Sequence, residues 1–154
     1  MLVAGRYRRE DSKQIMSVQR TFSIIKPDAV AAGQASEILA MIQKAGFKIV
    51  GLRMTRLTEA QAQGFYAVHR ERPFFGGLVK FMTEGPIIVM ALERENAILG
   101  LREVMGSTNP ANAAEGTVRK RFAANIERNC IHGSDAPETA ETELRFFFST
   151  AELI

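Results

Sequence analysis

The 154-residue sequence predicts an α+β fold: a ferredoxin-like, split βαβ arrangement in which helices cover an antiparallel sheet and a helical segment is inserted. Two observations support this fold class. Four short segments have the apolar patterns of strands, and segments with helical spacing separate them. The longest apolar run, at 86–92, is rich in β-branched residues and is typical of a central strand buried on both faces.

The first half of the chain is expected to form a βαβ unit. A strand at 21–26 ends at Pro27, because proline cannot donate a hydrogen bond to a sheet. A helix at 34–45 follows, with Gly46 as its stop signal. A half-buried strand is then expected at 47–55, and the alternation assigns to its buried face Val50, Leu52 and Met54.

The helical insertion precedes the central strand. A capping box formed by Thr58 and Gln61 opens a helix that extends to about Val68. Pro73 begins a second short helix, and Gly85 ends it. After the strand at 86–92, the remaining elements are expected to be a helix at 95–105, a loop at 106–117, a short helix at 118–125, a short strand within 129–135 and a last helix at 137–147.

Length and charge indicate one domain with a leading extension. The hydrophobic content of 46% and the charged content of 24% are values of globular proteins. Residues 1–20 hold five Lys or Arg and two acidic residues, which accounts for the whole net charge of +3. We expect residues 1–20 to be a loosely ordered extension, with Met16 as an alternative start, and residues 21–154 to be the domain. Because that domain is neutral, we expect no specific nucleic-acid partner.

The sequence also indicates a cytoplasmic protein with no membrane partner. Its longest apolar run is far too short to span a bilayer, and residues 1–16 lack the apolar core of a secretory signal. Cys130 is the single cysteine, so no intramolecular disulfide can form, and a reducing compartment fits.

The stretch NCIHGSD, at 129–135, is the first candidate for chemistry. It places His132 at the end of a short strand, beside Gly133, whose missing Cβ would leave room for an incoming group, and before a helix N-terminus that can favour an anion. Histidine can act as a nucleophile, but this stretch by itself favours the alternative of a structural histidine in a tight turn. Lys26 ends the first strand and can bind phosphate, and its alternative is a solvated surface lysine.

Other residues suit an anionic substrate with a transferable phosphoryl group. Cationic side chains at element ends, such as Arg102 and Arg119, favour phosphoryl transfer, which depends on positioning and charge neutralisation. One of the adjacent Phe74 and Phe75 can face outward and stack on a nucleobase, unless both are core residues. No cluster of carboxylates indicates a built-in metal site, and His69, which lies among charged residues, is expected at the surface.

Four segments together resemble the nucleoside diphosphate kinase family. They are SIIKPDAV, RPFFGGLVKFM, STNPANA and NCIHGSD, and they occur in the order and spacing of that family over about residues 20–150. The resemblance implies a ping-pong reaction, in which a nucleoside triphosphate, usually ATP, phosphorylates His132 and the phosphohistidine then phosphorylates a nucleoside diphosphate. It also implies Mg²⁺ carried on the nucleotide phosphates, a broad range of bases and sugars, and a homo-oligomer that is a hexamer or a tetramer.

The resemblance assigns roles to further residues. Glu143, with help from Ser134, would orient His132, and Tyr66 would hold the pocket near it. Phe74 would stack on the base, with apolar contacts from Leu78 and Ile126. The residues implied to bind phosphates or the sugar hydroxyl are Lys26, Arg102, Thr108, Arg119 and Asn129.

The chain departs from the family pattern in small ways, and a rival function is considered separately. Ala136 stands where family members commonly have serine, which weakens the cap of the last helix, and the leading segment is longer than usual. The loop at 106–117 would lie at subunit contacts. The alternative is a catalytically idle family member that acts as an interaction protein, which would lack a site residue.

Overall fold

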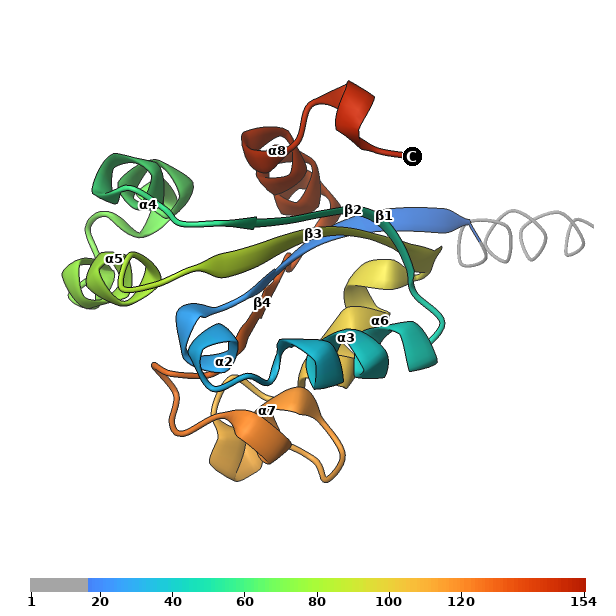
Figure 1. Ribbon diagram of the computed structural model, residues 1–154, viewed down its shortest axis with the longest axis horizontal. Helices are drawn as coiled ribbons and strands as arrows, with labels where there is room; N and C mark the ends of the chain where they lie inside the picture. Colours follow the sequence, from blue (N-terminus) through green and yellow to red (C-terminus); the bar gives the residue numbers. More distant parts are fainter. Residues whose placement is uncertain (1–16) are drawn as a thin grey trace, which may run out of the picture.

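The computed structural model describes residues 17–154, so the extension expected at 1–16 lies outside the described residues. A four-stranded antiparallel sheet has the strand order β2-β3-β1-β4 (Figure 1). The strands are β1 (Val18–Ile25), β2 (Lys48–Thr55), β3 (Ile87–Glu95) and β4 (Ile131–Gly133). This order and the helices between the strands confirm the predicted ferredoxin-like α+β fold.

Helices cover both faces of the sheet, with α4 and α8 on one side and α3, α6 and α7 on the other (Figure 1). The α-helices are α2 (Pro27–Ala31), α3 (Ala35–Lys44), α4 (Glu59–Phe65), α5 (Phe75–Met82), α6 (Ala97–Met105), α7 (Val118–Phe122) and α8 (Pro137–Phe147), and the 3₁₀ turns are η1 (Ala67–His69), η2 (Pro110–Asn112) and η3 (Thr150–Glu152).

Two hydrophobic clusters form the core, one on each face of the sheet. Strand β1 contributes to both, because Phe22 and Ile24 point toward α4, α5 and α8, whereas Ile25 points toward α3 and α6. These side chains are completely buried, and each contributes about 1.5–3 kcal/mol of hydrophobic stabilisation. Residues 87–92 of β3 are also buried, which confirms the prediction of a central strand.

Several boundaries differ from those expected. Strand β1 begins at Val18 and pairs with β3 from there, so residues 18–20 belong to the sheet and not to a loose extension. The five-residue helix α2 is not among the expected elements, because Pro27 indicates the end of the strand and five residues are too few to show a helical period. Strand β3 continues to Glu95, and helix α6 begins at Ala97 after Asn96, whose φ of 51° turns the chain.

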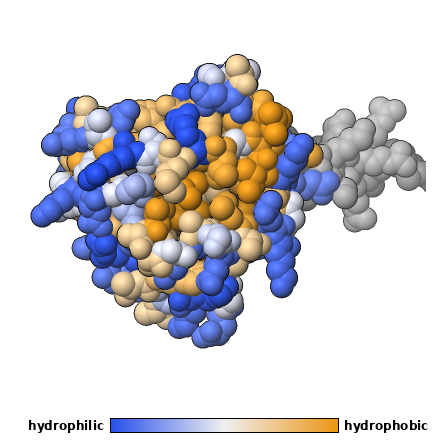
Figure 2. All heavy atoms as spheres, viewed as in Figure 1, coloured by the Kyte–Doolittle hydropathy of each residue, from blue (hydrophilic) through white to orange (hydrophobic). Residues whose placement is uncertain are grey.

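The predicted buried face of β2 is wrong beyond Val50. Leu52 and Met54 are 52% and 59% exposed. The register with β3 shifts between Ile49 and Gly51, which is a β-bulge, and an extra residue reverses the faces of every later side chain. The reversed side chains of β2, which is an edge strand, are therefore left exposed, and Figure 2 shows hydrophobic residues gathered over this part of the surface.

Within residues 17–154, no helix is both long enough and apolar enough to cross a membrane.

Candidate active site

A cleft of about 1680 Å³ opens beside β4, between α5 on one side and α6 with the 106–117 loop on the other. Glu143 lies behind the cleft. The other residues predicted for the site all line it: Lys26, Tyr66, Phe74, Leu78, Arg102, Thr108, Arg119, Ile126, Asn129, His132 and Ser134. The fold therefore brings together residues from seven separate parts of the sequence.

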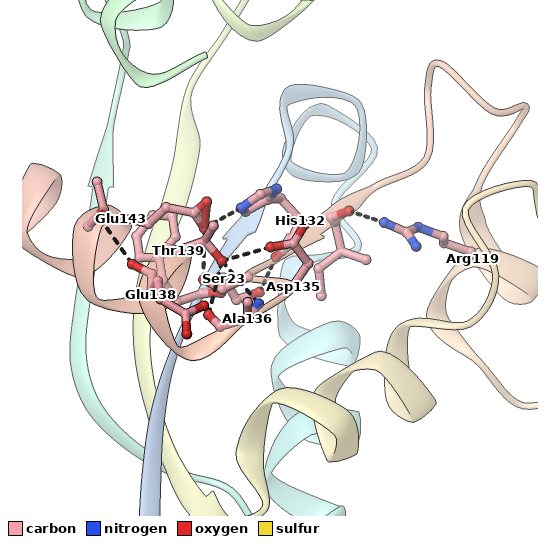
Figure 3. Close-up of polar contacts among 12 residues, drawn as sticks. Ser23, Arg119, His132, Asp135, Ala136, Glu138, Thr139 and Glu143 are labelled. Carbon is pink, nitrogen blue, oxygen red and sulfur yellow. Dashed lines mark hydrogen bonds and ion pairs between the residues drawn. The ribbon is translucent and has the colours of Figure 1, made fainter. Parts of the chain in front are cut away.

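His132 is fixed at one of its two ring nitrogens. The residue lies in β4 opposite Ile24 of β1, and its Nε2 is 2.7 Å from Oε1 of Glu143, one of the polar contacts drawn in Figure 3. The ring centroid also lies 6.0 Å from that of Phe22 and 5.6 Å from that of Phe65. These contacts hold the ring in one orientation and leave Nδ1 as the nitrogen available to a ligand in the cleft.

The same carboxylate oxygen of Glu143 also accepts a hydrogen bond from Ser134 Oγ at 2.7 Å. Glu143 reaches both partners because it lies two turns into α8, at the edge of that helix's buried face. The helix begins after Ala136 without a side-chain cap from that residue. Thr139 compensates, since its Oγ1 accepts the Ala136 N–H at 3.0 Å and donates to Asp135 Oδ1 at 2.7 Å.

Gly133 serves helix packing. A Cβ at this position would lie 2.7 Å from Sδ of Met105 and 3.0 Å from Cδ2 of Leu101. The missing side chain thus lets α6 approach β4. We expected Gly133 to leave room for an incoming group, but side chains of α6 fill the space that a Cβ would occupy.

Lys26 is a buried lysine, so the surface alternative is wrong. Its Nζ donates to Asn129 Oδ1 at 2.8 Å, and its side chain is only slightly exposed at the cleft. Burial, and after it the charge of the nearby Arg119, lowers the pKa of Lys26 to about 8. Burial disfavours the charged form of this amine. An anionic ligand close to Nζ would favour the charged form and offset that effect.

Arg119 enters from the other side of β4 (Figure 3). Its guanidinium donates to the carbonyl oxygens of Gly106 at 2.9 Å and Ile131 at 2.8 Å, which fixes its plane. Burial lowers its pKa to about 10, so it remains charged at neutral pH. Its buried Nε has no hydrogen-bond partner among residues 17–154, and this leaves a donor unsatisfied beside the cleft.

Tyr66 presents a buried hydroxyl at the cleft that has no hydrogen-bond partner in the described part of the chain. Burial raises the pKa of this phenol, and the charge of Glu143 raises it further, so the hydroxyl stays protonated. It is therefore a hydrogen-bond donor without a partner close to His132 and Glu143.

The outer end of the cleft is apolar. Phe74 is 52% exposed and Ile126 is 55% exposed, whereas the neighbouring Phe75 packs against the core. This arrangement resolves the aromatic pair: Phe74 is the outward ring. His69, which was expected at the surface, is half-exposed and lines the cleft, with its ring centroid 5.5 Å from that of Phe74. Its charged sequence neighbours hid this position, which depends on the turn between α4 and α5.

The chemistry that fits this cleft is the binding of a polyanion beside a histidine. Arg102 and Thr108 are exposed and add a cation and a hydroxyl to the wall opposite Phe74. Among residues 17–154, no three His, Cys, Asp or Glu side chains are grouped so that they could hold a metal ion.

Comparison with known proteins agrees with this geometry. A family model described as nucleoside diphosphate kinase matches residues 19–153. The nucleoside diphosphate kinase of Nitratidesulfovibrio vulgaris strain Hildenborough is 60% identical over 137 residues, which are 89% of this chain and 99% of that protein. That of Trichlorobacter lovleyi is 57% identical over the same shares of both chains.

Solved structures show the same similarity. The nucleoside diphosphate kinase of Aquifex aeolicus superposes with a TM-score of 0.88 at 43% identity, over 90% of this chain and 100% of that one. The enzyme of Halobacterium salinarum, solved in complex with CDP, gives a TM-score of 0.86 at 38% identity, over 90% and 92%. The match of sequence and fold shows that the chain belongs to the nucleoside diphosphate kinase family.

Proposed function

We propose that this protein is a nucleoside diphosphate kinase that transfers the terminal phosphoryl group of a nucleoside triphosphate, usually ATP, to a nucleoside diphosphate through a phosphohistidine at His132. One observation carries the proposal: Glu143 holds Nε2 of His132 at 2.7 Å, and this directs Nδ1 to a cleft that also holds buried cations.

The reaction divides into two transfers of the same kind. The lone pair of Nδ1 attacks the terminal phosphorus, the bond from that phosphorus to the bridging oxygen breaks, and the nucleoside diphosphate leaves with the bond's electrons. A terminal oxygen of the second nucleoside diphosphate then attacks the phosphohistidine, and the bond between phosphorus and Nδ1 breaks. Nε2 keeps its proton throughout and donates a hydrogen bond to Glu143, whose negative charge favours the positive imidazole that forms.

The cleft neutralises the phosphates. Arg119 and Lys26 are positioned before the substrate arrives, Arg102 and Thr108 add contacts from the loop side, and Tyr66 donates near the reacting nitrogen. Positioning and charge neutralisation supply most of the catalysis in phosphoryl transfer. Mg²⁺ is part of the substrate in this proposal, bound to the nucleotide phosphates, and a substrate-bound ion fits the lack of a ligand cluster within residues 17–154.

The nucleoside is held by contacts that do not read base edges. Phe74 stacks on the base, Leu78 and Ile126 add apolar surface, and Asn129 with Lys26 binds the sugar hydroxyl. Because every base offers a π-face, a stacking site accepts many bases, and we propose a broad range of nucleotides.

We also propose that the protein forms a homo-oligomer, a hexamer or a tetramer, in the cytoplasm. The exposed Leu52 and Met54 on the edge strand β2 support self-association, because adjacent exposed apolar side chains are typical of interfaces. The loop around Pro110 is a further expected subunit contact. The substrates are nucleotides, and the proposal includes neither a membrane nor a specific nucleic-acid partner.

The test is phosphorylation of the purified protein by ATP with Mg²⁺, followed by discharge to GDP. We expect an acid-labile phosphoryl group on His132, then GTP, and neither product from His132→Ala. EDTA should prevent the first step. If folded wild-type protein formed no phosphoenzyme, the catalytically idle alternative would replace this proposal.

A further inference from the structure

We propose that Asp28 is a positioning residue for the nucleotide site: its carboxylate holds the left-handed turn at Cys130, and that turn directs the neighbouring Asn129 toward the nucleotide sugar. This inference rests on the proposed function, because it needs a nucleotide in the cleft. Asp28 itself lies outside the residues that line the cleft.

The turn has an unusual backbone. Cys130 has a φ of 72°, in the left-handed region that side chains with a Cβ rarely adopt. Both of its peptide groups are held by the start of α2. The Cys130 N–H donates to Asp28 Oδ2 at 3.1 Å, and the Cys130 carbonyl oxygen accepts the Lys26 N–H at 2.8 Å. A strained turn between two such contacts persists because the surroundings hold it.

Asn129 depends on this turn for its direction. Its Oδ1 accepts from Lys26 Nζ at 2.8 Å, and its Nδ2 donates to the Ile126 carbonyl oxygen at 3.1 Å. Relaxation of Cys130 to a negative φ would rotate the peptide that joins it to Asn129 and move the carboxamide. His132 is held separately, by pairing with β1 and by Glu143, so the turn affects the sugar contact more than the nucleophile.

Among residues 17–154, the backbone N–H that donates to the Asp28 carboxylate is that of Cys130. The second oxygen of this carboxylate, Oδ1, is buried and lacks a hydrogen-bond partner among residues 17–154, which is unfavourable for an acid. Burial, and after it the charge of Asp28, raises the pKa of the Cys130 thiol to about 12, so this thiol remains protonated. Cys130 therefore contributes its backbone conformation and not a thiolate.

The test compares kcat/KM for GDP with that for 2′,3′-dideoxy-GDP, because a ratio is independent of the fraction of folded enzyme. Asp28→Ala should lower kcat/KM for GDP by roughly tenfold, which is near the upper end of the effect of one lost hydrogen bond between neutral groups. It should leave the value for the dideoxy nucleotide within about threefold. Phosphoenzyme formation from ATP should remain detectable. Asp28→Ala combined with Asn129→Ala should lose no more than Asn129→Ala alone, since both changes remove one contact.

Two conservative variants distinguish the position of the side-chain oxygen from the charge of the side chain. They test the proposal even if Asp28→Ala does not fold. Asp28→Asn keeps an oxygen for the Cys130 N–H and should retain the wild-type ratio of kcat/KM for GDP to kcat/KM for the dideoxy nucleotide. Asp28→Glu keeps the charge but has a longer side chain, and it should lower this ratio. The reverse result would show that charge, acting on Lys26, is what matters and would overturn the proposal. Thr58→Ala is the matched control, because it removes an acceptor of a backbone N–H at the start of α4 and should leave the ratio unchanged.

An unchanged ratio in Asp28→Ala, in protein that still forms the phosphoenzyme, would remove only the role of Asp28. Wild-type protein that forms no phosphoenzyme would remove the proposed function, and this inference with it.

Discussion

Replacing Glu143 by glutamine tests how much the charge of that residue contributes to phosphorylation of His132. The side chains of His132 and Glu143 are 22% and 17% exposed, so the contact between them is only partly screened by water. Glutamine has the same length. Its single amide oxygen can accept from both His132 Nε2 and Ser134 Oγ, as the single oxygen of Glu143 does. The substitution therefore removes the charge and keeps both hydrogen bonds.

The magnitude follows from the class of hydrogen bond. A bond to a charged group contributes roughly 1.5–3 kcal/mol and a neutral bond roughly 0.5–1.5 kcal/mol, so the difference is about 1.4 kcal/mol. That difference is about tenfold in rate. Glu143→Ala removes the acceptor for both partners, and we expect a loss of roughly a hundredfold, or about 2.7 kcal/mol.

The assay is a single-turnover measurement of phosphoenzyme formation from saturating ATP, by rapid quench, together with an equilibrium titration of nucleotide affinity. Affinity should be unchanged in Glu143→Gln, because Glu143 lies behind the cleft. Glu141→Gln is the matched control, since this exposed carboxylate on the same helix pairs with Arg145. A rate for Glu143→Gln within twofold of wild type would refute the reasoning and leave Glu143 a structural role only.

Three further predictions concern the base, the buried lysine and the last helix. Phe74→Ala should raise KM roughly tenfold for ADP, GDP, CDP and UDP alike with little change in kcat, because stacking contributes about 1–3 kcal/mol to any base; steady-state kinetics that show a loss for one base alone would contradict this. Lys26→Met should be more stable than wild type at pH 7, where folding of the wild type must bury the charged amine. The difference in free energy of unfolding should shrink as pH rises from about 8, the pKa of Lys26 in the folded protein, to 10.5, its ordinary pKa. Unfolding titrations of both proteins across that pH range measure this difference. Ala136→Ser should raise the free energy of unfolding by about 1 kcal/mol through a cap to the N–H of Thr139, seen as a rise in Tm at unchanged kcat.

The sequence predicted the order of the elements because each long element has a clear hydrophobic period. It failed where tertiary geometry decides. The five residues of α2 are too few to show a helical period, and the faces of Leu52 and Met54 depend on a bulge that shifts the pairing of β2 with β3. A bulge depends on which strand lies alongside, and a single sequence does not show its partner.

For the site, the sequence predicted which residues gather, and the structure adds how they are held. The segment NCIHGSD contains His132, and the family resemblance implies that Glu143 of the last helix orients it, but their 2.7 Å contact at Nε2 depends on the docking of α8 against β4. The left-handed turn at Cys130 could not be predicted, since cysteine carries no preference for that conformation. The sequence does not show that His69 lines the cleft, because its neighbours are charged and its position follows from the turn between α4 and α5.

The two hydrophobic clusters have a consequence for motion. The cleft takes Tyr66 and Leu78 from the side of the sheet that carries α4 and α5, and Leu101 and Met105 from the side that carries α6. Beyond the edge strand β4 no further strand joins the two layers within the described part of the chain. Opening of either layer by itself would widen the cleft, so a bound nucleotide must slow both openings at once. Amide hydrogen exchange should therefore slow on addition of nucleotide in α5 and in α6 together, although these helices lie on opposite faces of the sheet.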